Sequence, residues 1–357
     1  MTDEKSQGLD PTLPLDEADL EAALALPEVP QSDDARDVIS RELAHVLEAG
    51  SDLALVLSGD MSRALGELPF SDGVPAAAWC VSDVSALAQL HHLFRLGGAA
   101  GAVTNTAGCT DVELEAAGLA HCEEAAIDGA VRAALSASPR YVLGRVRGFA
   151  VGDAAREALA REALVREAAR LEEAGVHGFV AEGGSAAETV LALQAVREVS
   201  GRPVIATMAP GACSGDPATG MAAPEAVSRL QCDLHELACA GASALGAELG
   251  LGDLGEPLEM LALLSQREGL ALCVRVANDA DVADAAAEDG ASAARARRAR
   301  AASAAAVARA LEAAAATLTA AGVRTVSLGR GFLPGDTARL VQFLRPHFAS
   351  LGWRFVT

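Results

Sequence analysis

Short apolar runs alternate with helix-like stretches along this chain, and almost every run ends in polar or glycine-rich residues. Strands that alternate with helices run parallel and are buried on both faces, which explains continuous apolar runs where one-sided strands would alternate. Eight such units predict an α/β protein of the closed (β/α)8, or TIM barrel, type. The predicted strands are 53–59, 99–106, 141–148, 178–184, 203–209, 242–250, 271–278 and 325–331.

Polar residues at the ends of these runs are the first candidates for a site, because barrel chemistry takes place at the C-terminal ends of the strands. Carboxylates, amides and guanidiniums dominate the set, which suits a small zwitterionic ligand such as an amino acid. Salt bridges that close the rim would place the same residue types there. The candidates are Ser58, Gly59, Asp60, Thr104, Asn105, Thr106, Arg145, Arg147, Glu182, Thr207, Glu248, Asn278, Asp279 and Arg330.

The N-terminal segment 1–36 has a different composition from the rest. It carries ten acidic side chains against Lys5 and Arg36, with four prolines and no aromatic ring. Such a segment buries too little apolar surface to offset its ordering entropy, so we expect an acidic, disordered tail with one short helix around 15–26. A lead-in helix at 37–49 then opens the barrel domain, 37–357.

Net charge and hydropathy limit the classes of partner and the location that we expect for this protein. A net charge of −21 disfavours nucleic acid and anionic membranes, which attract basic surfaces. No early apolar run resembles a signal peptide and no uncharged stretch reaches membrane-spanning length, so the expected location is the cytoplasm. One local exception is basic. The exception is an alanine-rich stretch that carries Arg295, Arg297, Arg298 and Arg300. We expect these arginines to form the solvated face of a long helix; alternatively, they dock an acidic partner or the tail.

The counts of lysine, histidine and cysteine exclude several chemistries. Lys5 is the only lysine and lies in the tail, which excludes Schiff-base catalysis in the barrel. No histidine falls at a predicted strand tip, which argues against histidine acid-base catalysis and histidine-bound metal. Seven cysteines without a C-x-x-C spacing fit neither a disulfide framework nor a zinc ribbon. Only Cys109 and Cys213 follow strand tips and could face the site.

The order of these tips resembles the homocysteine S-methyltransferase family. The segments that carry the resemblance are LVLSGDMSRAL (55–65), VTNTAGCT (103–110), GFVAEGGSAAE (178–188), PVIATMAPGACSGDPATG (203–220) and VRVANDADV (274–282). Together they extend over nearly the whole barrel. The resemblance implies a pocket for an amino acid, with Glu182 at the glutamate that contacts the homocysteine amino group and Asn278 at a turn asparagine.

The same comparison shows what this sequence lacks. Family members hold zinc with three cysteine thiolates, one after strand six and two at strand eight. The matching segments here read GAELG (246–250) and LGRGFLPGD (328–336), which place Leu249, Arg330 and Gly331 at the three positions. Ser58 replaces the aspartate of the first strand. Since all three ligand positions lack cysteine, we expect no metal and no cofactor. Zinc makes the substrate sulfur a nucleophilic thiolate in this family, so we also expect no ordinary zinc-dependent methyl transfer.

Three functions remain open at this stage. The barrel binds an amino-acid-type ligand and transfers a methyl group without zinc, it is a catalytically silent scaffold or regulatory subunit of a methyltransferase system, or it is a phosphate-binding enzyme with Glu182 or Glu248 as base. The last rests on Gly-Arg-Gly at 329–331, which resembles a phosphate cradle. A methyl donor would be a free small molecule or a separate, for example corrinoid, protein.

Residue roles follow from these alternatives. The catalytic candidates are Glu182, Glu248 and Arg330, and we expect Glu248 and Arg330 to form an ion pair at the former metal position. The candidates for ligand binding are Ser58, Gly59, Asn105, Glu182, Thr207 and Asn278.

Overall fold

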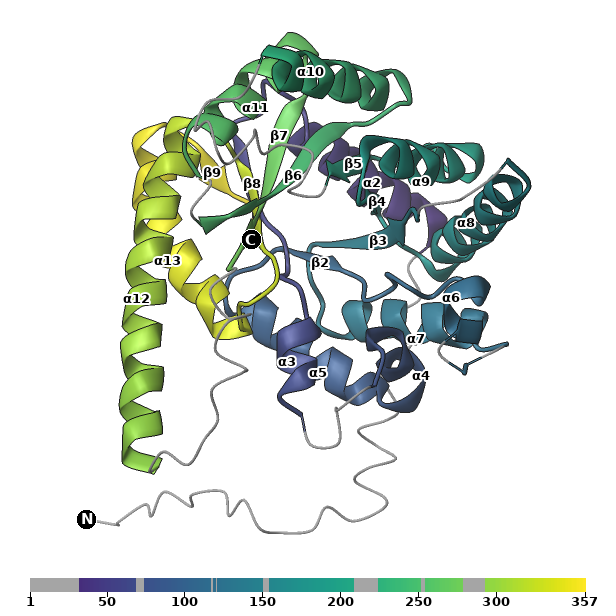
Figure 1. Ribbon diagram of the computed structural model, residues 1–357, viewed down its shortest axis with the longest axis horizontal. Coiled ribbons are helices and arrows are strands. Elements are labelled where there is room, and N and C mark those ends of the chain that lie inside the picture. Colours follow the sequence, from purple (N-terminus) through teal and green to yellow (C-terminus); the bar gives the residue numbers. More distant parts are fainter. Residues whose placement is uncertain are drawn as a thin grey trace.

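The computed structural model describes residues 32–68, 74–116, 118–119, 121–149, 154–208, 224–251, 254–278 and 293–357, with side chains left undescribed at 116, 154–156, 224–226 and 293–303. Parallel strands alternate with helices along this part of the chain, so the predicted α/β barrel-like fold is confirmed (Figure 1). The strands are β1 (Leu53–Val56), β2 (Gly101–Val103), β3 (Tyr141–Arg147), β4 (Gly178–Gly183), β5 (Val204–Met208), β6 (Ala244–Gly250), β7 (Ala271–Ala277), β8 (Thr325–Leu328) and β9 (Arg354–Phe355).

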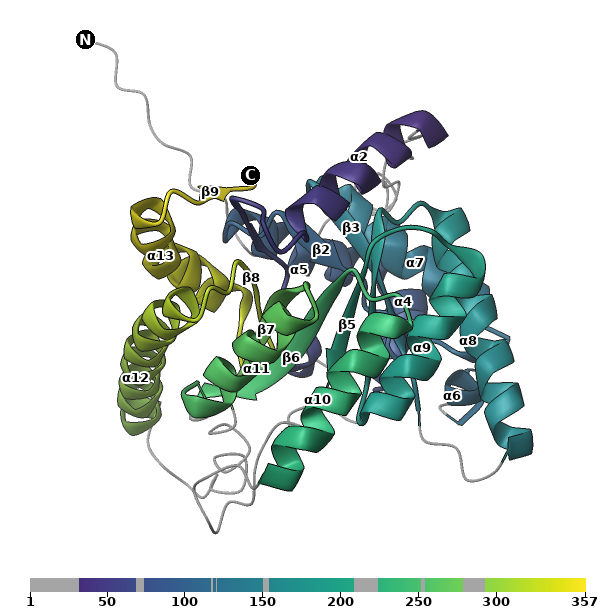
Figure 2. The same cartoon turned by 90° about the horizontal axis from the view of Figure 1, so that it is seen from above.

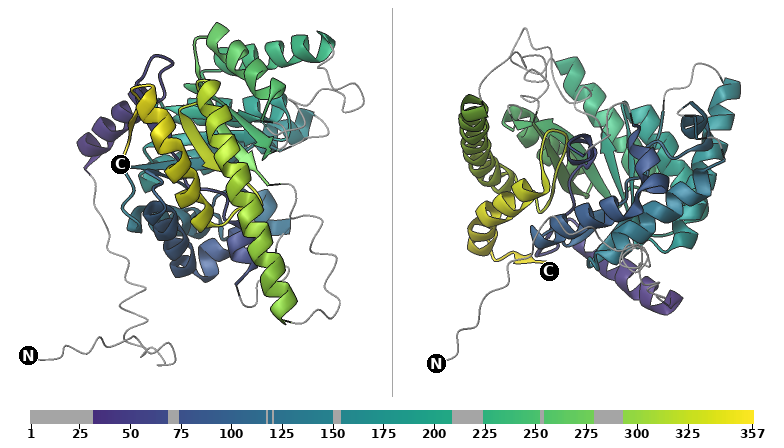
Figure 3. Two further views of the ribbon diagram at one scale, coloured as in Figure 1. Left: turned by 90° about the vertical axis from the view of Figure 1, so that its left-hand side faces the viewer. Right: turned by 90° about the horizontal axis from the view of Figure 1, so that it is seen from below.

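The helices surround the strands in Figure 1, as continuous apolar runs require. Their bounds are α2 (Asp33–Val46), α3 (Ser62–Gly66), a 3-10 turn at Ala76–Ala78, α4 (Trp79–Ser82), α5 (Val84–Leu96), α6 (Asp111–Ala116), α7 (Glu123–Ser136), α8 (Ala154–Ala174), α9 (Ala186–Val199), α10 (Pro224–Cys239), α11 (Glu256–Arg267), α12 (Ala293–Ala320) and α13 (Pro334–Ser350). The long helix α12 packs along α13 (Figure 3).

The sheet runs in the order β2-β3-β4-β5-β6-β7-β8-β1-β9. Strands β1 and β2 also meet, because Leu57, which follows β1, forms a parallel bridge with Gly101 of β2. The backbone N–H of Ala100 donates to the Val56 carbonyl at 2.9 Å, and that of Ser58 donates to the Gly101 carbonyl at 2.7 Å. These bonds join β1 to β2 and close the sheet into a barrel.

Helix α2 closes the N-terminal end of the barrel. It begins at Asp33, with the Ser32 side chain accepting from the backbone N–H of Ala35, and thus starts four residues before the predicted lead-in helix. Its residues Leu43 and Val46 join the inward-facing apolar side chains of the strands in one buried cluster. The chain's final strand β9, which the sequence pattern did not predict, pairs with β1 near the same end (Figure 2).

Several predicted features lie outside the described residues. These are residues 1–31 of the acidic tail, Cys213 and Asp279; the side chains of Arg295, Arg297, Arg298 and Arg300 are also not described. Within the described part of the chain, no helix combines the length and apolarity that a membrane crossing requires.

Candidate functional site

A cavity of about 390 Å³ opens at the C-terminal ends of the strands, the end of the barrel opposite α2. We call it the mouth cavity. Seven of the side chains that line it carry charge, and they come from four strands and two strand-to-helix loops. The lining includes Asp60, Ser62, Ala76, Asn105, Ala107, Arg145, Arg147, Glu182, Gly183, Gly184, Thr207, Met208, Glu248, Arg275 and Arg330.

Six of these seven charged residues form a continuous chain of contacts with alternating sign, whereas Arg147 pairs with Glu113. Arg145 contacts Asp60 at 3.5 Å on one side and Glu182 at 2.6 Å on the other. Arg275 continues from the second oxygen of Glu182, at 2.9 Å, to Glu248, at 3.4 Å. Arg330 ends the chain, with its Nε 3.4 Å from Oε1 of Glu248.

The two central carboxylates are satisfied to different degrees. Each oxygen of Glu182 is bonded to its own arginine at 2.9 Å or less, and its side chain is 9% exposed. Both oxygens of Glu248, in contrast, have their nearest cationic nitrogen at 3.4 Å. Since charge-assisted hydrogen bonds are normally 2.7–2.9 Å long, Glu248 retains more capacity to accept a further donor.

The arginines keep Glu182 ionised. Burial opposes its charge, but the positive charges of Arg145 and Arg275 outweigh burial and lower the pKa of Glu182 to about 2. The pKa of Asp60 is also lowered, because Arg145 and the hydrogen bonds from Ser62 outweigh the effect of burial. Glu182 is thus a fixed negative charge at the centre of the cavity.

Two threonines after β2 hold Arg145 in place. The backbone N–H of Arg145 donates to the hydroxyl of Thr104 at 3.0 Å, and the hydroxyl of Thr106 donates to the Arg145 carbonyl at 2.5 Å. The two hydroxyls are also 2.9 Å apart. The segment after β2 therefore fixes the backbone of the arginine that joins Asp60 to Glu182.

The turn after β8 positions Arg330. Gly331 has a φ of +82°, a conformation that glycine adopts without strain, and a Cβ there would lie 2.4 Å from the carbonyl oxygen of Asn278. The backbone N–H of Asn278 donates to the Arg330 carbonyl at 2.9 Å, and its side-chain amide lies 3.5 Å from the Gly331 carbonyl. Asn278 therefore fastens the Arg330 turn to the end of β7.

The predicted site residues fall into two groups. Glu182, Glu248, Arg330, Asn105 and Thr207 line the mouth cavity together, and the predicted contact between Glu248 and Arg330 is present. The amide nitrogen of Asn105 donates to the Ala76 carbonyl at 2.8 Å.

Three predicted ligand-binding residues make structural contacts next to the cavity. The Ser58 hydroxyl accepts from the backbone N–H of Val103 at 2.9 Å and so adds to the β1–β2 seam. A Cβ at Gly59 would lie 2.9 Å from the Leu328 carbonyl and 3.0 Å from the Phe94 ring, so this glycine allows close packing. Asn278, as described above, contacts the β8 turn.

Arg275 is the residue that the sequence pattern did not single out. It lies inside the apolar run of β7, not at its tip. The signal was available, since an arginine two residues after the inward-facing Cys273 must also face the barrel interior. Its meeting with Glu182, three strands away in the sheet, is a property of the closed barrel.

The positions that match zinc ligands in the resembling family do not fit a zinc site. Leu249 is buried in the core between strands and helices, Gly331 has no side chain, and Arg330 is cationic. Cys109 is fully buried behind Asn105, with its sulfur 3.9 Å from the Asn105 carbonyl, and does not line the cavity. Among the residues that the structure describes, no three His, Cys, Asp or Glu side chains are placed to hold a metal ion together.

Comparisons with known proteins give likenesses of fold. No protein-family model and no curated protein matches the chain. The oxidized form of homocysteine methyltransferase MmuM from Escherichia coli is 17% identical with a TM-score of 0.59, and the match covers 82% of this chain and 96% of that chain. Its metallated form gives 0.58 over the same shares. The carboxyl transferase domain of Rhizobium etli pyruvate carboxylase gives 0.50 at 13% identity, over 92% of this chain and 54% of that chain.

Proposed function

We propose that the mouth cavity binds a small zwitterionic ligand of the amino-acid type. In this proposal Glu248 accepts hydrogen bonds from the ammonium group of the ligand, and Arg330 binds the carboxylate of the ligand. The observation that carries this assignment is the difference between the two carboxylates, because Glu182 is saturated by arginines and Glu248 has only contacts at 3.4 Å. The Arg330 side chain is 65% exposed, so a ligand reaches it without breaking a buried pair.

The remaining residues of the cavity position this pair. Glu182 holds Arg275 beside Glu248, and Arg145 holds Glu182 from the other side. Asn105 and Thr207 supply side-chain oxygens on the wall. A cavity of about 390 Å³ is in the range of pockets that enclose small molecules, which supports an amino acid over a polymer as ligand.

The reaction that we propose for this pocket is methyl transfer to the sulfur of the bound amino acid, without zinc. The sulfur forms a bond to the methyl carbon, the bond from that carbon to the donor breaks, and the thiol proton passes to water. The guanidiniums of Arg275 and Arg330 favour the thiolate electrostatically, although less strongly than a metal would. The methyl donor is a small molecule or a separate protein.

A second candidate is a barrel that binds the ligand without performing chemistry, as a scaffold or regulator. One observation favours it. Glu182 has a pKa of about 2 and both of its oxygens are paired, so it is poorly suited to accept a proton near neutral pH. The same pKa argues against Glu182 as the base of a phosphate-binding enzyme.

Calorimetric titration with homocysteine, methionine and S-adenosylmethionine tests binding, and mass spectrometry of homocysteine incubated with a sulfonium methyl donor tests the reaction. Saturable binding of at least one amino acid, lost in Glu248→Gln, supports the pocket. Binding without methylated product favours the scaffold. If no amino acid binds, the assignment of the ligand class is wrong.

A further inference from the structure

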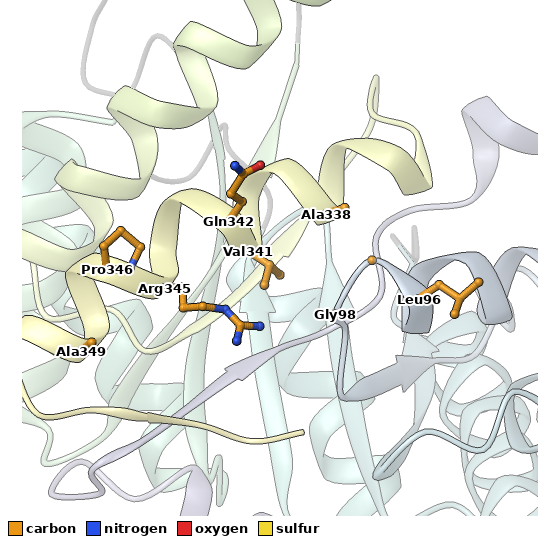
Figure 4. A pocket seen from close by; sticks show the side chains of 9 residues that line it. Leu96, Gly98, Ala338, Val341, Gln342, Arg345, Pro346 and Ala349 are labelled. Atoms are coloured by element: carbon orange, nitrogen blue, oxygen red, sulfur yellow. The ribbon is translucent and has the colours of Figure 1, made fainter.

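A groove of about 580 Å³ lies between the C-terminal end of α5 and the outer face of α13, and it shares no lining residue with the mouth cavity (Figure 4). Its lining is mostly apolar and includes Leu96, Ala338, Val341, Pro346 and Ala349. Leu96 is 66% exposed, and Leu93, one turn earlier on α5, is 49% exposed. Leu96 lines the groove, and Leu93 is on the same face of α5 three residues earlier, so exposed leucines adjoin an apolar groove, as they do at many protein interaction sites.

The groove continues into a second hollow of about 470 Å³. The two share Gly98, Val341 and Arg345 in their linings. The second hollow extends between the end of β9 and the residues that precede β2 and β3, at the N-terminal end of the barrel. We call the two hollows together the α5–α13 surface.

Two arginines give this apolar surface a positive edge. Arg95 and Arg345 are exposed, and neither has a carboxylate partner among the described residues. The guanidinium of Arg345 lies over the Phe355 ring, 5.5 Å from its centroid. A partner that fits must combine carboxylates with apolar side chains.

The chain carries such a segment at its own N-terminus. Residues 1–31 contain eight carboxylates against the single Lys5, together with six leucines. The part from 16 to 21 holds four of the carboxylates, at Asp16, Glu17, Asp19 and Glu21. Among the chain's own segments, it combines the required charge and apolar groups.

The point where this segment joins the described chain also lies close to the α5–α13 surface. It joins the described chain at Ser32, the N-cap of α2, and α2 contacts the second hollow because Glu42 pairs with Arg140. The ten helical residues between Ser32 and Glu42 span about 15 Å. Residues 16–21 precede Ser32 by 11 to 16 positions, which reach about 36–53 Å when extended.

From these observations we infer that residues 1–31 dock on the α5–α13 surface of the same chain. The leucines of the segment cover Leu93 and Leu96, and its carboxylates pair with Arg95 and Arg345. The ion pairs are at the surface, so docking weakens as salt rises. While docked, the segment excludes other proteins from this surface.

Photo-crosslinking of the full chain tests the inference. With Leu20→p-benzoylphenylalanine, irradiation is expected to give intramolecular crosslinks to peptides of α5 and α13. Arg95→Glu with Arg345→Glu should reduce their yield about fivefold or more, since each reversed surface pair shifts the docking equilibrium several-fold. Leu93→Asp with Leu96→Asp should also reduce it.

The matched control reverses two exposed arginines elsewhere, Arg132→Glu on α7 and Arg267→Glu on α11, and should leave the yield unchanged. Circular dichroism of each variant establishes that the barrel is folded. Crosslinks to α12 near Arg295–Arg300, crosslinks between two molecules, or a yield that the Arg95 and Arg345 changes do not alter would each overturn the inference.

Discussion

A guanidinium nitrogen of Arg275 lies 2.9 Å from the carboxylate of Glu182 and so joins β7 to β4, two strands that are not neighbours in the sheet. The pair forms the middle of the charged chain in the mouth cavity. Arg275 occupies the second oxygen of Glu182, and Glu248 is therefore the carboxylate that we propose for ligand binding.

Removing Arg275 should therefore be costly. We expect Arg275→Met to lower the free energy of unfolding by about 3 kcal/mol, because it leaves a buried carboxylate with one partner, Arg145, in place of two. Urea denaturation measures this loss, and adding Glu182→Gln should recover part of it. Additive effects of the two changes would contradict the coupling.

The outer pair should behave differently. Arg330 is 65% exposed and 3.4 Å from Glu248, so Arg330→Met should lower the free energy of unfolding by less than about 1 kcal/mol. A double-mutant cycle with Glu248→Gln should give a coupling energy in the same range. A coupling of several kcal/mol would mean that the pair is structural and not poised for a ligand.

The turn that holds Arg330 offers a test of positioning. Gly331→Ala places a Cβ against the Asn278 carbonyl at a positive φ, so it should cost about 1–2 kcal/mol and displace Arg330. Binding of the amino-acid ligand should weaken several-fold. Gly335→Ala is the matched control, because a Cβ there would meet nothing within 4 Å. Equal affinities for the two variants would refute a positioning role for this turn.

His177 should make the barrel acid-sensitive. Its ring is buried and accepts from the backbone N–H of Val142 at 2.9 Å, and burial together with nearby arginines lowers its pKa to about 4. Since an unfolded histidine titrates near 6.5, this stabilisation is complete above about pH 6.5 and is lost as pH falls toward 4, by on the order of 3 kcal/mol. In His177→Asn the pH dependence of unfolding should flatten across that window.

Metal analysis tests the expectation that this protein holds no zinc at the positions that match the family's zinc ligands. With Leu249, Arg330 and Gly331 at those positions, we expect purified protein to carry no stoichiometric zinc. Elemental analysis decides this directly. About one tightly held zinc per chain would show that other side chains, with Cys109 and Cys213 as first candidates, have formed a new site.

The fold was predictable because every central strand is a continuous apolar run that local sequence marks clearly. Strand β9 was missed since it is only two residues long and exists through its pairing with β1. Helix α2 begins earlier than expected because Ser32 supplies an N-cap that composition alone did not reveal.

Prediction from the strand tips picked out Glu182, Glu248 and Arg330, and all three line the mouth cavity; their roles in binding or catalysis stay predictions. It failed for Arg275, whose importance depends on which side chains meet across the closed barrel. The sequence also could not distinguish Asn278 and Ser58, which make backbone contacts beside the cavity, from residues that line it. Those differences arise from tertiary geometry and have no local pattern.

Whether Glu248 receives the ammonium group of an amino acid is tested most directly by calorimetry with a ligand pair that differs only in that group, homocysteine and 4-mercaptobutyrate. In the wild-type protein, loss of the amino group should weaken binding about tenfold or more, the value of one charge-assisted hydrogen bond. In Glu248→Gln, homocysteine should bind correspondingly more weakly and the difference between the two ligands should largely disappear. An undiminished preference for homocysteine in Glu248→Gln, or no measurable binding of homocysteine to the wild-type protein, would contradict this assignment.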